Sequence, residues 1–208
     1  MNSAANCRSY FELLSQTVRN LPFGQVDEVS EVLFHAYETQ STVFVFGNGG
    51  SAALASHFAC DLAKGTVNGG KKRFKVMALT DNVPLMTAWA NDSHYEDIFS
   101  EQLSNFARNG DVAFAISASG NSPNVLKALT AAKQSGLTTT GLTGFSGGRM
   151  LPLCDACIVV PCDNMQIIED LHLCVAHSLF TCIRDRISHG KTAESRMRPR
   201  LLPRAIAK

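Results

Sequence analysis

Apolar residues follow two patterns along the chain: helical spacing in the first 40 residues, then short apolar runs that alternate with helical stretches. One helix face is formed by Tyr10, Leu13, Leu14, Val18 and Leu21, and a second by Val26, Val29, Val32, Leu33 and Ala36. The segment Leu21-Pro22-Phe23-Gly24 separates the two faces, because proline and glycine interrupt helical order. The sequence therefore predicts two helices in this first part.

Five short and almost wholly apolar runs follow, at 42–46, 74–79, 112–116, 138–143 and 156–160. Helical patterns lie near 51–64, 84–107 (interrupted around Asn91-Asp92), 122–135, 147–153 and 165–187. Short apolar strands that are separated by helices are typical of a parallel sheet covered on both faces. With right-handed crossovers, this order predicts an α/β fold, a three-layer sandwich around a five-stranded parallel sheet.

A single domain is expected to cover residues 1–187, because the chain of 208 residues is 45% hydrophobic and no linker divides it. The charge is uneven. Residues 184–208 carry eight Lys or Arg against two Asp or Glu, a balance of +6, and the rest of the chain carries −5. We interpret 188–208 as a basic, solvated and mobile tail. Nucleic-acid binding is not favoured, because no aromatic residues alternate with the arginines.

Composition also limits the location of the protein. The longest apolar runs, such as Val43-Phe44-Val45-Phe46, are far shorter than the roughly 20 residues of a membrane span. No apolar segment typical of a secretory signal follows the first residues. We therefore expect a soluble, cytoplasmic protein whose seven cysteines are reduced thiols. Cys154 and Cys157 have the spacing of a zinc or redox pair, but no second pair follows, so we interpret them as ordinary thiols at a strand entrance.

The loops that follow the strands are the candidate ligand sites, because ligands bind beyond the carboxyl ends of parallel strands. After the first strand comes Gly47-Asn48-Gly49-Gly50-Ser51-Ala52, whose glycines let backbone amides turn toward an anion at a helix start. A dinucleotide site is an alternative, although no acidic residue follows about 20 positions on. A glycine turn that only packs the strand against the helix is another.

A second loop, Ser117-Ala118-Ser119-Gly120-Asn121-Ser122-Pro123, follows the third strand. It offers three hydroxyls, and Ser122-Pro123 is typical of a helix cap and first helical residue. A serine-rich cap alone would explain Ser122 but not Ser117 and Ser119. Two such loops at one sheet edge favour a phosphorylated metabolite as the ligand.

These motifs and others, in the same order, resemble the sugar isomerase (SIS) domain. The matching segments are Gly47 to Ser51, His57-Phe58-Ala59, Asn91-Asp92, Ile116 to Ser122 and Leu142-Thr143-Gly144. Within that group the chain is similar to phosphoheptose isomerases, which interconvert sedoheptulose 7-phosphate and an aldose heptose 7-phosphate. The resemblance covers roughly residues 5–187. It implies a flavodoxin-like sheet, a helical hairpin within residues 1–40 used in oligomerisation, and a homotetramer with active sites at subunit interfaces.

The resemblance also assigns substrate-binding residues. It implies that the sugar phosphate is held by Ser51, Ser117, Ser119 and Ser122, that Asn48, Gly49 and Gly50 line the pocket, and that Asp92 and Glu169 contact the substrate. Ala118 stands where the family usually has threonine. A hydroxyl is lost there, but the backbone amide remains available for phosphate.

Candidate proton-transfer groups lie on two predicted helices. An aldose–ketose interconversion moves a proton between C1 and C2 through an enediolate, which requires a base and an acid. His57 and Asp61 are four residues apart on one helix face, and the last helix carries Glu169, Asp170, His172 and His177. The resemblance implies a divalent metal, most commonly zinc, held by His57, Asp61, Glu169 and His177, with Asp61, Glu169 and His177 in catalysis.

Three exchanges leave the roles open. Asp61 replaces the family's more usual glutamate, Glu169 replaces a glutamine, and Gln166 stands where an acid often contacts substrate. Either Asp61 or Glu169 could therefore be the base. Glu169 and His177 are also eight residues apart, about 12 Å along a helix, so reaching one metal requires them to lean together or to serve different subunits. On angular grounds Asp170 is a rival to Glu169.

The expected function is a metal-assisted isomerase that converts sedoheptulose 7-phosphate to D-glycero-D-manno-heptose 7-phosphate. Two alternatives have no catalytic step: an SIS-domain regulator of the kind that contacts the replication initiator, and a phosphosugar-sensing module. Neither would need Asp61 and His177, whose presence favours catalysis.

Overall fold

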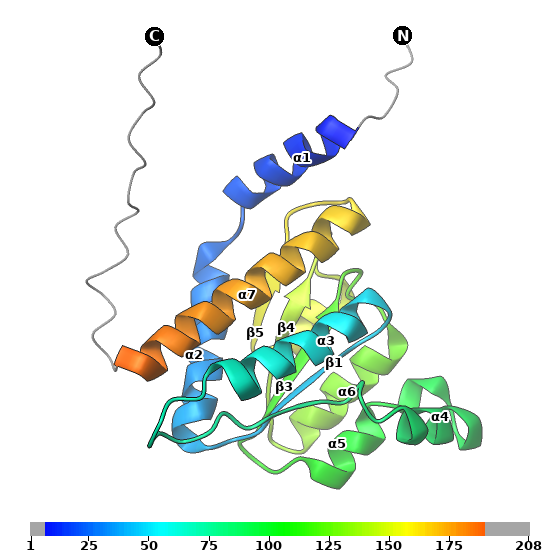
Figure 1. Cartoon of the computed structure of the whole chain (residues 1–208). Helices are drawn as coiled ribbons and strands as arrows, with labels where there is room; N and C mark the ends of the chain where they lie inside the picture. The colour runs from blue at the N-terminus through cyan, green and yellow to red at the C-terminus, as the bar shows by residue number, and fades with distance from the viewer. Residues whose placement is uncertain (1–6, 190–208) are drawn as a thin grey trace, which may run out of the picture.

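A computed structural model describes residues 7–189; residues 1–6 and 190–208 lie outside the described part. Its centre is a five-stranded parallel sheet with the strand order β2-β1-β3-β4-β5. The strands are β1 (Val43–Gly47), β2 (Val76–Ala78), β3 (Val112–Ser117), β4 (Thr138–Thr143) and β5 (Ala156–Val159). Helices cover both faces of this sheet (Figure 1), which gives the three layers.

The helices are α1 (Cys7–Arg19), α2 (Phe23–Thr39), α3 (Gly50–Cys60), α4 (Val83–Asp92), α5 (Ser100–Phe106), α6 (Pro123–Gln134) and α7 (Met165–His189). A π-helical turn (Asp61–Gly65) extends α3, and 3-10 turns lie at Tyr95–Asp97 and Gly148–Leu153. One face of the sheet packs against α2, α3 and α7, and the other against α4, α5 and α6. The long α7 runs beside α3 on the first face (Figure 1).

Side chains of the central strands alternate between two cores. In β1, Val43 and Val45 face α2, α3 and α7, whereas Phe44 and Phe46 face α5 and α6, and all four are buried. Because both faces are covered, a central strand has no solvent side and reads as a continuous apolar run. Among the described glycines, Gly141 in β4 lies closest to a neighbouring backbone: a Cβ there would lie 2.0 Å from the Ala115 carbonyl oxygen of β3.

The predicted fold class is confirmed, and each strand falls on a predicted apolar run. The expected interruption is also present, because α4 ends at Asp92. The structure differs from the helix predicted near 147–153. This segment forms a 3-10 turn, because Gly147 and Gly148 have positive φ and Pro152 offers no N–H. None of the described helices combines the length and the apolar character needed to cross a membrane.

Both expected N-terminal helices are present, and α1 packs against α7. The Tyr10 hydroxyl donates a 2.6 Å hydrogen bond to Asp170, and this bond, together with burial, raises the pKa of Tyr10 to about 12. Leu14 packs on the buried Ile168 and Leu171. At its other end α7 continues to His189, two residues past the expected domain end at 187. The expected tail otherwise lies outside the described residues.

All seven cysteines lie in the described residues, and all are free thiols. Cys154 precedes β5 and Cys157 lies within it. A hydrogen bond with Cys157, followed by burial, raises the pKa of Cys154, so this thiol stays protonated. Cys154 therefore lacks the thiolate character that metal binding or thiol exchange requires.

Candidate functional site

Three loops meet at the carboxyl edge of the sheet, because β1, β3 and β4 are parallel neighbours. The register pairs Gly47 with Ile116, and Ser117 with Thr143. The two loops that the sequence singled out, 47–51 and 117–122, therefore lie side by side. A third, which begins at Gly144, is joined to the second because its N–H donates to the Ala118 carbonyl.

The serine-rich loop brings its hydroxyls together at the start of α6. The Oγ atoms of Ser117 and Ser122 lie 3.4 Å apart, and the Asn121 N–H donates to Ser119 Oγ at 3.2 Å. Gly120 has a φ of 64°, and a Cβ there would lie 2.2 Å from the Gly147 carbonyl oxygen. Glycine thus permits the tight turn that gathers these hydroxyls beside a helix N-terminus, an arrangement that suits an anion.

The glycine-rich loop is fixed by residues that sequence reasoning missed. Asn48 and Asn124 exchange two hydrogen bonds of 2.8 Å through their side-chain amides, and Asn124 is buried. The Tyr95 hydroxyl also donates to Asn48, at 3.2 Å. The position of Asn124 in the first helical turn after Ser122-Pro123 was the one available signal, since an inward-facing amide there needs a polar partner.

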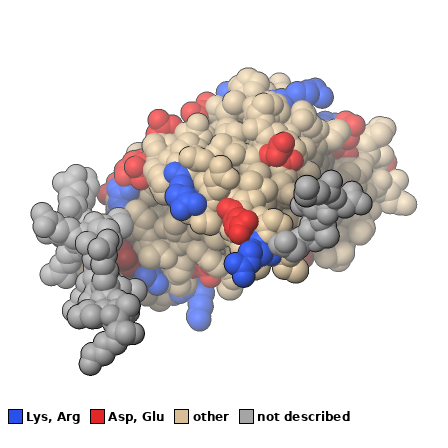
Figure 2. Space-filling view, turned by 90° about the horizontal axis from the view of Figure 1, so that it is seen from above, with Lys and Arg blue, Asp and Glu red and all other residues tan. Residues whose placement is uncertain are grey.

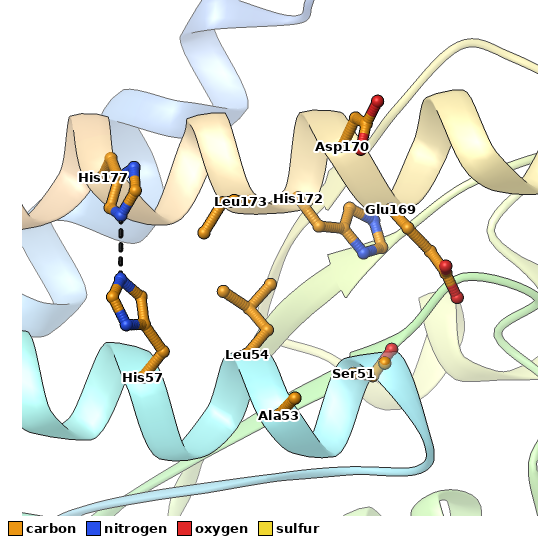
Figure 3. A pocket seen from close by; sticks show the side chains of 10 residues that line it. Ser51, Ala53, Leu54, His57, Glu169, Asp170, His172, Leu173 and His177 are labelled. Atoms are coloured by element: carbon orange, nitrogen blue, oxygen red, sulfur yellow. Dashed lines mark hydrogen bonds between the residues drawn. The ribbon is translucent and has the colours of Figure 1, made fainter.

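His57, Asp61 and His177 form a compact donor cluster. The Nε2 atoms of the two histidines lie 2.9 Å apart, and Asp61 Oδ2 is 3.4 Å from the first and 3.8 Å from the second. Figure 3 shows the two imidazoles pointing toward one another from α3 and α7. The side chains of His57 and His177 are 50% and 49% exposed, and that of Asp61 is 24% exposed. The cluster is therefore open to a ligand.

The cluster depends on close packing between α3 and α7. His57 and Asp61 are four residues apart on one continuous helical stretch, and Asp61 opens the π-helical turn. Such turns are rare and are frequent at functional sites. Gly65 ends this turn against Phe180 of α7, where a Cβ would lie 2.5 Å from Phe180 Cζ. The absence of a side chain at Gly65 therefore lets α7 approach closely enough for His177 to meet His57.

Glu169 does not join this cluster within the described residues. Its carboxylate oxygens lie 3.5 Å from the position of a Cβ on Gly50, at the first turn of α3, and Figure 3 shows it well separated from His177. Two turns of α7 cause the separation, about 12 Å along the axis. The rival Asp170 accepts the hydrogen bond of Tyr10. The structure thus gathers three of the four predicted metal ligands.

The donor cluster fits a divalent metal. The two nitrogens and one carboxylate oxygen all lie within 4.8 Å of one another. Ligands about 2.0–2.1 Å from a tetrahedral zinc ion are themselves separated by about 3.3 Å, close to the three distances in the cluster. Two imidazoles and a carboxylate with further positions open are also the donor types of catalytic zinc sites. The residues present therefore form a possible metal site.

A cavity of about 440 Å³ runs between α3 and α7. Its lining includes Gly50, Ser51 and Glu169 at one end and His57 and His177 at the other, with His172 between the two ends (Figure 3). Asp92 is not among the lining residues; it ends α4, is exposed, and accepts a hydrogen bond from Asn91. The cavity therefore joins the first loop to the donor cluster.

Comparison with known proteins identifies the family. The SIS domain profile matches residues 8–144. A phosphoheptose isomerase of Rhodospirillum rubrum is 41% identical over 162 residues, which cover 78% of this chain and 86% of the relative. The chain belongs to the phosphoheptose isomerase family of SIS-domain proteins.

Solved structures of the family agree with this assignment. The phosphoheptose isomerase GmhA from Neisseria gonorrhoeae superposes with a TM-score of 0.80 at 28% identity, covering 86% of this chain and 96% of that one. The phosphoheptose isomerase from Francisella tularensis gives the same TM-score and coverage at 29% identity. The phosphoheptose isomerase fold thus extends over nearly all of the described residues.

Proposed function

We propose that this protein is a ketose–aldose isomerase that converts sedoheptulose 7-phosphate to D-glycero-D-manno-heptose 7-phosphate. One observation carries the proposal: a single cavity joins the helix start at Gly50-Ser51, a position suited to an anion, to the cluster of His57, Asp61 and His177. A phosphate group and a reacting carbonyl group need these two different environments. Membership of the phosphoheptose isomerase family supports the substrate class.

The phosphate end of the substrate belongs at the sheet edge in this proposal. Ser51, Ser117, Ser119 and Ser122 supply hydroxyls, Asn48, Gly49, Gly50 and Ala118 line the same edge, and Asp92 is kept as a substrate contact from the family resemblance. The amino ends of α3 and α6 both contribute partial positive charge there. A phosphate can therefore be held by backbone and hydroxyl donors without a lysine or arginine.

The length of the cavity suits a seven-carbon chain. Gly50 and His57 are seven residues apart on α3, about 10 Å along its axis. An extended seven-carbon sugar phosphate spans eight bonds from C1 to phosphorus, also about 10 Å at roughly 1.2 Å per bond. With the phosphate at the sheet edge, C1 and C2 reach the cluster.

The reacting end is assigned to the cluster. His57, Asp61 and His177 would hold a divalent ion, with zinc as the proposed identity because of its preference for this donor set. When bound, such an ion polarises the substrate carbonyl and stabilises the developing oxyanion. Asp61 is the proposed base, because its carboxylate lies with the imidazoles, and His177 is the proposed acid that returns the proton. Glu169, beside Gly50, would then bind substrate hydroxyls instead of completing the metal site.

A homotetramer with sites at subunit interfaces completes the proposal. Proton transfer is favoured where water is excluded, yet His57 and His177 are half-exposed in one subunit. Exposed apolar residues lie on α1, which packs against α7 (Phe11 and Val18), and beside the cavity (Leu173). A neighbouring subunit that packs on these residues would close the site.

The test is turnover by the purified protein of five-, six- and seven-carbon ketose phosphates, with and without prior chelation. We expect sedoheptulose 7-phosphate to be converted to an aldose, with solvent deuterium appearing at C2. Chelation is expected to lower the rate at least about 10²-fold, and zinc to restore it. Conversion of none of the sugars would refute the proposed function, whereas full activity after chelation would refute only the metal.

Ser119→Ala is expected to raise KM for the sugar phosphate about 10-fold while kcat changes little. The reason is that Ser119 is proposed to contribute a binding hydroxyl, worth about one hydrogen bond to a charged group, and is not a member of the donor cluster. Steady-state kinetics measures both constants. Ser135→Ala, at the opposite, exposed end of α6, is the matched control. An unchanged KM in Ser119→Ala would argue against this loop as the phosphate site.

The alternatives without catalysis are less well supported. A regulator or a phosphosugar sensor needs the serine loop but has no use for the cluster of two imidazoles and a carboxylate. On the face shown in Figure 2, basic and acidic side chains are interspersed and do not form a continuous basic stripe.

A further inference from the structure

His172 is enclosed between α7 and the end of β4, and only 1% of the residue is exposed. Its Nε2 lies 3.1 Å from the Thr143 carbonyl oxygen. Because a carbonyl can only accept, Nε2 carries the proton, and Nδ1 is left as an acceptor. Burial lowers the pKa of His172 to about 4, so the ring is neutral at physiological pH.

The second ring nitrogen has no partner among the described residues, although it is buried. Buried polar groups in folded proteins are nearly always satisfied, so an exception calls for an explanation. An apolar side chain would fill the same volume without this cost. The residue is therefore better explained by what its N–H does than by packing.

The N–H of His172 connects the two halves of the site. Thr143 ends β4, and the next residue, Gly144, donates its N–H to the Ala118 carbonyl in the serine loop. Gly144 also lies against Ile168 of α7, where a Cβ would meet Ile168 Cδ1 at 2.5 Å. The contact between Gly144 and Ile168 is apolar and does not by itself fix the position of α7 along the sheet edge, whereas a hydrogen bond is directional.

We propose that His172 is a positioning residue, whose N–H to the Thr143 carbonyl fixes α7, and with it His177, relative to the serine loop. The inference rests on the proposed function, because it concerns the distance between the phosphate site and the proton-transfer site. His172 lines the cavity between them. Without this hydrogen bond α7 can shift along the sheet edge, and a displacement of about 1 Å at a reacting centre lowers turnover about 10²-fold.

Two variants of nearly equal size test the proposal. In His172→Gln the terminal amide N–H₂ can reach the Thr143 carbonyl, whereas His172→Met fills similar space without a donor. We expect kcat to fall no more than about threefold in the glutamine variant and about 10²-fold in the methionine variant. Inorganic-phosphate affinity is expected to match the wild type in both variants, because the serine loop is not altered. Zinc affinity is expected to fall only in the methionine variant, because the donor cluster joins His177 of α7 to His57 of α3.

A second measurement does not depend on turnover. Calorimetry gives the factor by which zinc strengthens the binding of sedoheptulose 7-phosphate, a coupling that requires both ends of the site to engage one molecule. We expect this factor to persist in His172→Gln and to fall to near one in His172→Met. Should the methionine variant not fold, His172→Asn, whose amide is too short to reach Thr143, replaces it.

The outcomes separate the two proposals. If the wild type is active and both variants match it in kcat and in coupling, the positioning role is refuted and the proposed function stands. If the wild type converts no ketose phosphate, the proposed function is refuted, and the coupling factor alone decides on His172. A loss of coupling that glutamine prevents supports the inference in either case.

Discussion

Replacing His177 by alanine is expected to lower kcat for sedoheptulose 7-phosphate at least about 10³-fold. The change removes both the proposed acid and one of three donors that lie within 4.8 Å of one another. Binding of inorganic phosphate should survive, because the residues of the serine loop are not part of the donor cluster. Single-turnover kinetics and phosphate calorimetry on the same preparation measure the two effects separately.

The matched control for this variant is His35→Ala, which removes an exposed imidazole from α2, away from the cavity. Its kcat should equal that of the wild type. Wild-type turnover by His177→Ala would contradict the assignment of this residue. Loss of phosphate binding together with turnover would instead show that the variant is misfolded, which circular dichroism would reveal.

The second large effect is expected for Asp61→Asn, which keeps the shape of the side chain and removes its charge. We expect kcat to fall about 10²- to 10³-fold, because an amide cannot accept the substrate proton. Zinc affinity should also fall, since a carboxylate ligand becomes neutral. Rate measurements under saturating zinc distinguish the loss of the base from the loss of the metal.

Asp27→Asn supplies the control, as Asp27 is exposed on α2. Asp61→Asn also decides which of two carboxylates, Asp61 or Glu169, is the base. If Asp61→Asn keeps full activity in saturating zinc while Glu169→Gln does not, the base is Glu169, and the proposed role of Asp61 is wrong. The reverse result supports the arrangement in which Asp61 lies with the imidazoles and Glu169 lies beside Gly50.

Local chemistry explains what the sequence could predict. Strands such as β1 and β3 are buried on both faces, so their apolar runs are unmistakable. The parallel order then placed the loops at 47–51 and 117–122 on one edge. The pairing of His57 with Asp61 followed from helical spacing alone.

Tertiary packing explains what the sequence could not predict. The meeting of His57 with His177 depends on the bare backbone of Gly65 against Phe180, a contact between segments far apart in the chain. The burial of His172 depends on how α7 lies against β4. The distance between Glu169 and the cluster could be predicted, because Glu169 and His177 are eight residues apart on one helix.

The separation of His57 and His177 by 120 residues has a consequence for synthesis. On the ribosome all five strands emerge before α7, so a nascent chain can assemble its sheet and still lack half of the donor cluster. A product truncated after β5 would also expose the apolar core on the sheet face that Val175, Leu179 and Ile183 of α7 normally cover. Chaperones and proteases recognise exposed apolar surfaces. Incomplete chains are therefore degraded and do not accumulate as inactive protein.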